Sequence, residues 1–124
     1  MKVFVVDDSP LVRERLVLLL SEVEGVDVVG SAGRAEEGIE GISRSKPDVA
    51  ILDIRMPAGN GIAVLESIKR HGNPPTVIML TNYPYPQYRK KCMDAGADYF
   101  FDKSGEFHKV TDVLERMVAK EATG

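Results

Sequence analysis

Several features that would point to particular classes of protein are scarce or missing in this sequence. A single cysteine, Cys92, rules out an internal disulfide bond and fits a reducing compartment. No stretch approaches the length of a membrane span, and the first apolar run, residues 2–6, is too short for a signal peptide. A net charge of −3 gives no general attraction to nucleic acid or anionic membranes. We therefore expect a cytoplasmic protein that binds neither nucleic acid nor membrane.

The length and composition are those of one ordinary globular domain. The chain has 124 residues, of which 44% are hydrophobic and 28% are charged, and no repeat or low-complexity segment is visible. We expect the domain to occupy residues 1–120. Residues 121–124 would then form a tail or the start of a linker.

Short apolar runs alternate with amphipathic segments five times along the chain. The expected strands are residues 2–6, 26–30, 48–53, 76–81 and 97–102. The expected helices follow them, at about 10–25, 34–43, 62–71, 87–95 and 110–118. This alternation predicts an α/β domain with a doubly wound parallel sheet, whose usual strand order is 2-1-3-4-5.

Acidic residues follow the two strands that such a fold brings together. Asp7 and Asp8 end the first run, and Asp53 ends the apolar run of the third. In the order 2-1-3-4-5 the carboxyl ends of strands 1 and 3 flank the ligand crevice. Three carboxylates crowded there would repel one another unless a cation joined them, and oxygen ligands suit Mg²⁺. On its own an Asp-Asp pair before a helix is more often a strand end and cap.

Two further polar residues follow the other central strands. Thr81 ends the fourth and Lys103 follows the fifth. Aspartate is a weak nucleophile, but it can accept a phosphoryl group when a metal ion and a cation neutralise the transferring oxygens. We therefore interpret Asp53 as the phosphoryl acceptor. Taken singly, Lys103 and Thr81 are ordinary strand-end residues, so the interpretation depends on the whole set.

At these spacings the chain resembles the receiver domains of two-component response regulators over roughly residues 2–120. That family has a flavodoxin-like (βα)5 fold. The matching positions are Asp7-Asp8-Ser9, Asp53, Met56-Pro57, Gly61, Thr81, Ala95-Gly96-Ala97 and Lys103.

The resemblance implies a role for each residue of the site. Asp53 would take a phosphoryl group from a phosphohistidine of a sensor histidine kinase or phosphotransfer protein. Asp8 would bind Mg²⁺ directly, Asp7 mainly through a water molecule, and Arg55 through its backbone carbonyl. The domain would catalyse only its own phosphorylation and dephosphorylation, and so would not be an enzyme in the usual sense.

The resemblance also implies a switch. Lys103 would pair with the Asp53 carboxylate and then with the phosphoryl group, to which Thr81 would donate its hydroxyl after a loop shift. Phe100 stands at the position of the family's switch aromatic and would move into the space that Thr81 vacates. The alternative is a ring that never moves.

Three positions depart from the family pattern. Ser104 stands where a proline usually follows the lysine, which leaves the geometry of that peptide bond open. Phe100 replaces the commoner tyrosine. Arg55 is long and basic and would face the site, where we expect it to restrict hydrolytic water or to touch the phosphoryl group.

The surface made by the fourth helix, the fifth strand and the fifth helix is the family's usual output face. Here it carries Tyr85, Tyr88 and the basic run 89–91, which would suit a partner protein or a homodimer contact, or else be an ordinary solvated face. The readout would reach an output protein or a C-terminal output domain. The sequence leaves open whether the chain is a stand-alone receiver or part of a longer regulator.

Three other classes fit the sequence less well. A Mg²⁺-dependent aspartyl phosphatase needs Asp-x-Asp at one strand end, and Arg55 stands where the second acid belongs. A flavodoxin-like FMN carrier needs a phosphate-binding loop after the first strand, where two acids stand instead. A receiver-like domain that is never phosphorylated would not need the complete set of acids, Thr81 and Lys103.

Overall fold

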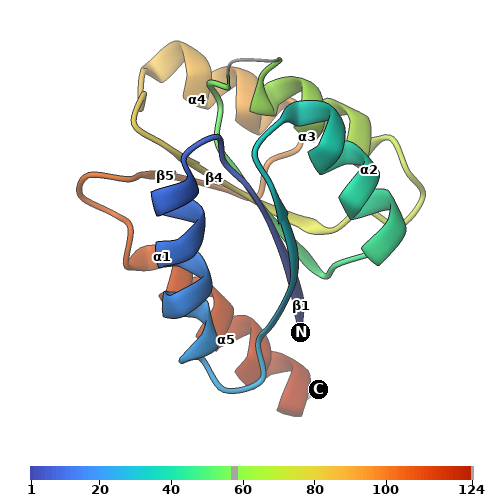
Figure 1. The fold of residues 1–124 in the computed structure, drawn as a ribbon, viewed down its shortest axis with the longest axis vertical. Helices are drawn as coiled ribbons and strands as arrows, with labels where there is room; N and C mark the ends of the chain where they lie inside the picture. Colours follow the sequence, from blue (N-terminus) through green and yellow to red (C-terminus); the bar gives the residue numbers. More distant parts are fainter. Residues whose placement is uncertain (57–58, 124) are drawn as a thin grey trace.

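The computed structural model describes residues 1–56 and 59–123 and confirms the alternating order of strands and helices (Figure 1). The strands are β1 Lys2–Val6, β2 Asp27–Ala32, β3 Val49–Leu52, β4 Thr76–Thr81 and β5 Tyr99–Asp102. The helices are α1 Pro10–Ser21, α2 Ala35–Ser45, α3 Gly61–Lys69, α4 Pro86–Asp94 and α5 Lys109–Thr123. All neighbouring strands are parallel in the order β2-β1-β3-β4-β5, as the sequence predicts.

Helices cover both faces of the sheet, and the sheet divides the core in two. Figure 1 shows α1 and α5 together on one side and α2, α3 and α4 on the other. Because side chains alternate along a strand, successive residues of β1 and β3 enter different halves of the core. Phe4 and Leu52 join the half beneath α2, α3 and α4, whereas Val5 and Ile51 join the half beneath α1 and α5. The central strands are therefore apolar throughout.

Several boundaries differ from the expected ones for local reasons. The strand β3 ends at Leu52, which leaves Asp53 in the loop beyond it. The start of β5 moves to Tyr99 because the N–H of Ala97 still donates to the carbonyl of Cys92 at the end of α4. Helix α2 continues to Ser45, and the left-handed Lys46, with φ of 48°, ends it. Helix α5 reaches Thr123, so the proposed tail at 121–124 begins within this helix.

A glycine that weakens α2 as a helix is required by its packing. A β-carbon at Gly41 would lie 2.4 Å from an atom of the Phe4 ring, so only glycine lets α2 lie this close to β1. The cost in helix propensity is about 1 kcal/mol. The low helix propensity of this segment is thus explained by its approach to the sheet.

Among the residues that the structure describes, no helix combines the length and apolar character that crossing a membrane requires.

Candidate functional site

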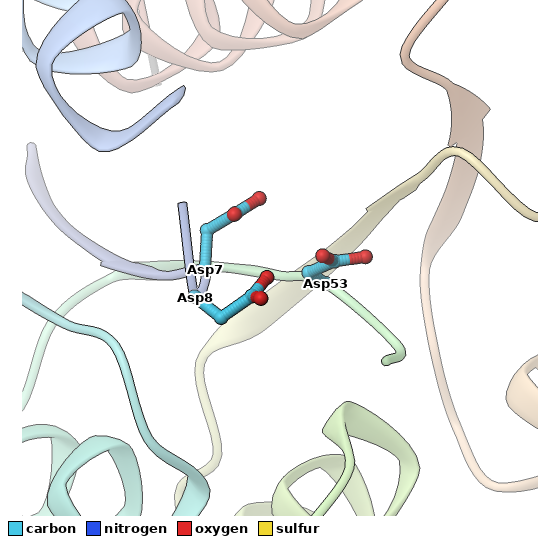
Figure 2. A group of neighbouring side chains, drawn as sticks. All are labelled: Asp7, Asp8 and Asp53. Atoms are coloured by element: carbon cyan, nitrogen blue, oxygen red, sulfur yellow. The ribbon is translucent and has the colours of Figure 1, made fainter. Parts of the chain in front are cut away.

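Three carboxylates meet at the carboxyl ends of β1 and β3 (Figure 2). Oxygen atoms of Asp7, Asp8 and Asp53 all lie within 4.8 Å of one another. Asp7 and Asp53 are 2% and 5% exposed, whereas Asp8 is open to solvent. The predicted convergence of these acids is therefore present, with two of them buried and the third exposed.

Backbone hydrogen bonds of the sheet hold the two buried acids. The N–H of Asp53 donates to the carbonyl of Val6 at 2.9 Å, which continues the pairing of β3 with β1 by one residue. The N–H of Asp7 donates to the carbonyl of Ala32 at 3.0 Å. The Asp7 carboxylate in turn accepts from the N–H of Ser9 at 2.9 Å. The acids are thus fixed by rigid strands and not by the loops that follow.

Gly61, the first residue of α3, lies against the backbone of Asp53. A β-carbon at Gly61 would lie 1.7 Å from the carbonyl oxygen of Asp53, and the Gly61 N–H donates to the carbonyl of Ile54 at 2.7 Å. Asn60 precedes this glycine and caps α3, since its side chain accepts from the N–H of Ala63 at 2.9 Å. The glycine expected from the sequence therefore has a steric reason. Pro57, expected beside it, lies outside the described residues.

Lys103 shares its ammonium group between the two buried carboxylates. Its Nζ lies 2.6 Å from an oxygen of Asp7 and 3.1 Å from one of Asp53, and its side chain is only 8% exposed. The backbone N–H of Lys103 donates to the carbonyl of Thr81 at 2.9 Å. The described residues contain no cis peptide bond, so the bond from Lys103 to Ser104 is trans. The departure from proline at this position therefore leaves Lys103 within reach of Asp53.

Burial and the neighbouring charges act in opposite directions on this cluster. Burial raises the pKa of the Asp53 carboxyl, attraction to Lys103 lowers it, repulsion from Asp7 raises it, and the net shift is upward. Burial alone would lower the pKa of Lys103. Its hydrogen bonds and ion pairs with Asp7 and Asp53 outweigh that effect, and the net pKa of Lys103 is raised. The ammonium group thus compensates for part of the crowding of the acids.

An open cleft of about 550 Å³ lies over the site. The residues that line it include Asp8, Asp53, Arg55, Asn60, Tyr83 and Lys103. A molecule entering the cleft would therefore meet the carboxylate of Asp53 beside two cations, Lys103 and Arg55, and one further acid, Asp8.

Thr81 and Phe100 are both buried, on the neighbouring strands β4 and β5. Thr81 is fully buried, and its hydroxyl accepts from the N–H of Tyr83 at 2.9 Å. The Phe100 ring is 5% exposed and packs beneath α2, α3 and α4. Of the five predicted site side chains, the structure groups Asp7, Asp8, Asp53 and Lys103, while the Thr81 hydroxyl is bonded to the loop after β4.

Sequence reasoning missed two features of the site. The cap at Asn60 was detectable, because Asn before a helix is a common N-cap. The second feature is a contact between Arg55 and two tyrosines. The Arg55 guanidinium lies 4.1 Å from the ring centre of Tyr83 and donates to the hydroxyl of Tyr88 at 3.0 Å. No local pattern could reveal it, since 28 and 33 residues separate the partners in the chain.

The chemistry of the three acids fits a small divalent cation. Opposite ligands of one Mg²⁺ lie about 4.2 Å apart, so oxygens within 4.8 Å of one another approach the spacing that a single ion needs. Mg²⁺ also keeps several waters, and the exposed Asp8 leaves the site open to them. The donor set is entirely oxygen, as this ion requires.

Comparison with known proteins gives a consistent result. The model of the response regulator receiver domain matches residues 3–115. The sensory transduction protein LytT of Bacillus anthracis is 30% identical over 116 residues, which cover 94% of this chain and 46% of LytT. This chain thus spans about half the length of that relative.

Solved structures agree. The receiver domain of a putative response regulator NarL from Mycobacterium tuberculosis is 30% identical with a TM-score of 0.86, and the match covers 95% of each chain. A chain of the CheX–CheY–BeF3–Mg complex from Borrelia burgdorferi is 28% identical with a TM-score of 0.79, covering 92% of this chain and 89% of that one. Fold, arrangement of acids and sequence together lead to one conclusion: this chain belongs to the receiver domains of two-component response regulators.

Proposed function

We propose that this receiver domain accepts a phosphoryl group on Asp53 and thereby switches the surface that a partner reads. One observation carries the proposal: Asp53 is buried at the end of β3, paired with Lys103, and opens onto a cleft that it shares with Asp8. The donor would be the phosphohistidine of a sensor histidine kinase or of a phosphotransfer protein.

The reaction moves one phosphoryl group. A carboxylate oxygen of Asp53 forms a bond to phosphorus while the bond from phosphorus to the histidine nitrogen breaks, and that nitrogen leaves with the electron pair. Lys103 would stay close to the transferring oxygens and offset their charge. Dephosphorylation is attack by water on phosphorus, which releases inorganic phosphate and restores the carboxylate. The domain would thus act only on itself.

Asp7, Asp8, Asp53 and the backbone carbonyl of Arg55 would hold a Mg²⁺ ion. When bound, the ion supplies further neutralisation of the phosphoryl oxygens. The two buried acids are already shared with Lys103, so the exposed Asp8 is the carboxylate free to make the first contact. One structural neighbour, from the CheX–CheY–BeF3–Mg complex, supports this assignment.

The signal would be read on the surface of α4, β5 and α5. Thr81 would leave its bond to the Tyr83 N–H and turn toward the phosphoryl group, and Phe100 would move into the space that it leaves. Tyr85, the N-cap residue of α4, is 47% exposed, and the helix itself carries the exposed basic run 89–91. Aromatic and basic side chains favour a protein partner, whether an output protein, an attached output domain or a second copy in a homodimer. We assign the domain to the cytoplasm, where such kinases deliver phosphate.

The test is phosphorylation by a small donor. Incubated with Mg²⁺ and acetyl phosphate, the protein should gain one acid-stable, base-labile acyl phosphate per chain, measured by intact mass. The variant Asp53→Asn should gain none, and EDTA should prevent the gain. Asp94→Asn, which alters an exposed acid of α4, is the matched control and should label normally. Persistent labelling of Asp53→Asn, or an unlabelled natural sequence, would refute the proposal.

A further inference from the structure

Arg55 does not point its charge at an acid. Its exposed guanidinium lies over the Tyr83 ring, 4.1 Å from the centre, and donates to the Tyr88 hydroxyl at 3.0 Å. Within residues 1–56 and 59–123, no carboxylate lies within ion-pair distance of it. The side chain therefore joins the loop after β3 to the loop after β4 and to the first turn of α4.

Tyr83 in turn holds the hydroxyl of Thr81. The Tyr83 N–H donates to the Thr81 Oγ1 at 2.9 Å, and Thr81 is fully buried. For the hydroxyl to reach a phosphoryl group on Asp53, this hydrogen bond must break or its donor must move. Whatever fixes Tyr83 therefore also favours the present place of the Thr81 hydroxyl.

We propose that Arg55 is a positioning residue: clamped between Tyr83 and Tyr88, it holds the loop after β4 in the arrangement in which the Thr81 hydroxyl accepts from the Tyr83 N–H. This inference rests on the proposed phosphorylation of Asp53 and adds a determinant of its switching. It differs from a direct contact of Arg55 with the phosphoryl group, because the guanidinium acts on the protein before any phosphoryl group is present.

The contacts of Arg55 with Tyr83 and Tyr88 should oppose the movement of Thr81 toward the phosphoryl group. A phosphoryl group that recruits Thr81 must overcome the contacts that keep Tyr83 in place, so weakening the clamp makes recruitment easier. One lost hydrogen bond of this kind changes an equilibrium by about two- to tenfold. The clamp is thus a modest but measurable bias toward the unphosphorylated arrangement.

The decisive variant is Tyr88→Phe, which removes only the acceptor of Arg55 and leaves every charge in place. Tyr85→Phe is the matched control. The Tyr85 ring centre lies 5.8 Å from that of Tyr88, but the Tyr85 hydroxyl does not accept a hydrogen bond from Arg55. Hydrogen exchange of single amides is measured by NMR in the free protein without Mg²⁺ or phosphate. The Tyr83 amide should exchange about two- to tenfold faster in Tyr88→Phe and unchanged in Tyr85→Phe.

Two further readouts separate positioning from general loosening. The amide of Val5, in the central strand β1, should exchange at its original rate in both variants. Arg55→Met should reproduce the effect, and combining it with Tyr88→Phe should add nothing. With Mg²⁺ present, beryllofluoride should bind Tyr88→Phe more tightly by the same factor.

Equal Tyr83 exchange in Tyr88→Phe and Tyr85→Phe would overturn the inference, as would equal acceleration at Val5. A natural sequence that fails to bind beryllofluoride would instead refute the phosphorylation of Asp53. The exchange comparison is made in the free protein and does not depend on beryllofluoride binding. Failure of the positioning role of Arg55 can therefore be distinguished from failure of the phosphorylation of Asp53.

Discussion

At the scale of single residues, the charge of one lysine decides how the acids can be buried. Asp7 and Asp53 are almost fully buried, and both reach the ammonium group of Lys103. Burying a carboxylate costs several kcal/mol unless it is paired, and here one cation serves two acids. Lys103 thus has a structural role in the free domain before any role in phosphoryl transfer.

Replacement of Lys103 by methionine should therefore destabilise the domain. In EDTA, Lys103→Met should lower the free energy of unfolding by about 3 kcal/mol, because two neighbouring buried carboxylates lose their counter-charge. Urea denaturation measures it. Lys90→Met is the control: its ion pair with Asp94 is exposed, with side chains 78% and 66% accessible, and its loss should leave the free energy of unfolding almost unchanged. Equal losses in the two variants would contradict this account of the cluster.

At the scale of elements, strands fix the acids and the connections after them shape the cleft. The connection from β3 to α3 is constrained at its end, where Asn60 caps the helix and Gly61 lies against the carbonyl of Asp53. Parallel strands direct their carboxyl ends to the same edge, so the residues that follow them meet there. The site is therefore formed by residues that follow the parallel strands, and Gly61 packs tightly against one of them.

Gly61→Ala tests this packing. The added carbon would meet backbone 1.7 Å away, which no side-chain rotation relieves, so the loop must move. We expect a loss of about 3 kcal/mol in unfolding free energy, together with a weaker Mg²⁺ response in tyrosine or NMR signals of the site. Gly105→Ala, where nothing lies within 4 Å, should be neutral within about 1 kcal/mol. A stable Gly61→Ala with normal Mg²⁺ binding would show that the loop can move to accept a side chain at this position.

At the scale of the whole molecule, the sheet separates two cores and unfolding must open both. Cys92 lies in the core beneath α2, α3 and α4 and is fully buried. Burial raises the pKa of its thiol from 9.0 to about 11, and Lys91 opposes the shift only weakly. The thiol of the folded protein therefore stays protonated at a pH at which the unfolded chain has already released this proton.

This difference predicts a pH dependence of stability. Below about pH 9 both states keep the proton, and the contribution of Cys92 is complete. Between about pH 9 and 11 only the unfolded state loses it, so unfolding becomes easier by about 1.4 kcal/mol per pH unit. The advantage of the natural sequence over Cys92→Ala should thus shrink between about pH 8 and pH 10 in urea denaturation. A constant advantage would mean that the thiol titrates alike in both states.

Much of the fold was predictable because its signals are local. Apolar runs of strand length alternate with one-sided helical patterns, and that alternation leaves few topologies open. The bounds of β1 and β4 were predicted correctly, whereas β5 was predicted too long because the end of α4 takes up Ala97. Boundaries depend on which partner satisfies each backbone group, and that partner is often distant in the chain.

The sequence by itself determined the order of the strands and the acids that follow β1 and β3. The periodicity of a strand or helix, and the residue at which it ends, depend mainly on residues that are neighbours in the chain. Only the tertiary structure decided that Lys103 serves both buried acids, that the Thr81 hydroxyl turns to Tyr83, and that Arg55 reaches Tyr88. Long, flexible side chains choose partners by distance in space, across gaps of tens of residues. The contact partners of these side chains are therefore set only when the folded sheet brings its strand ends together.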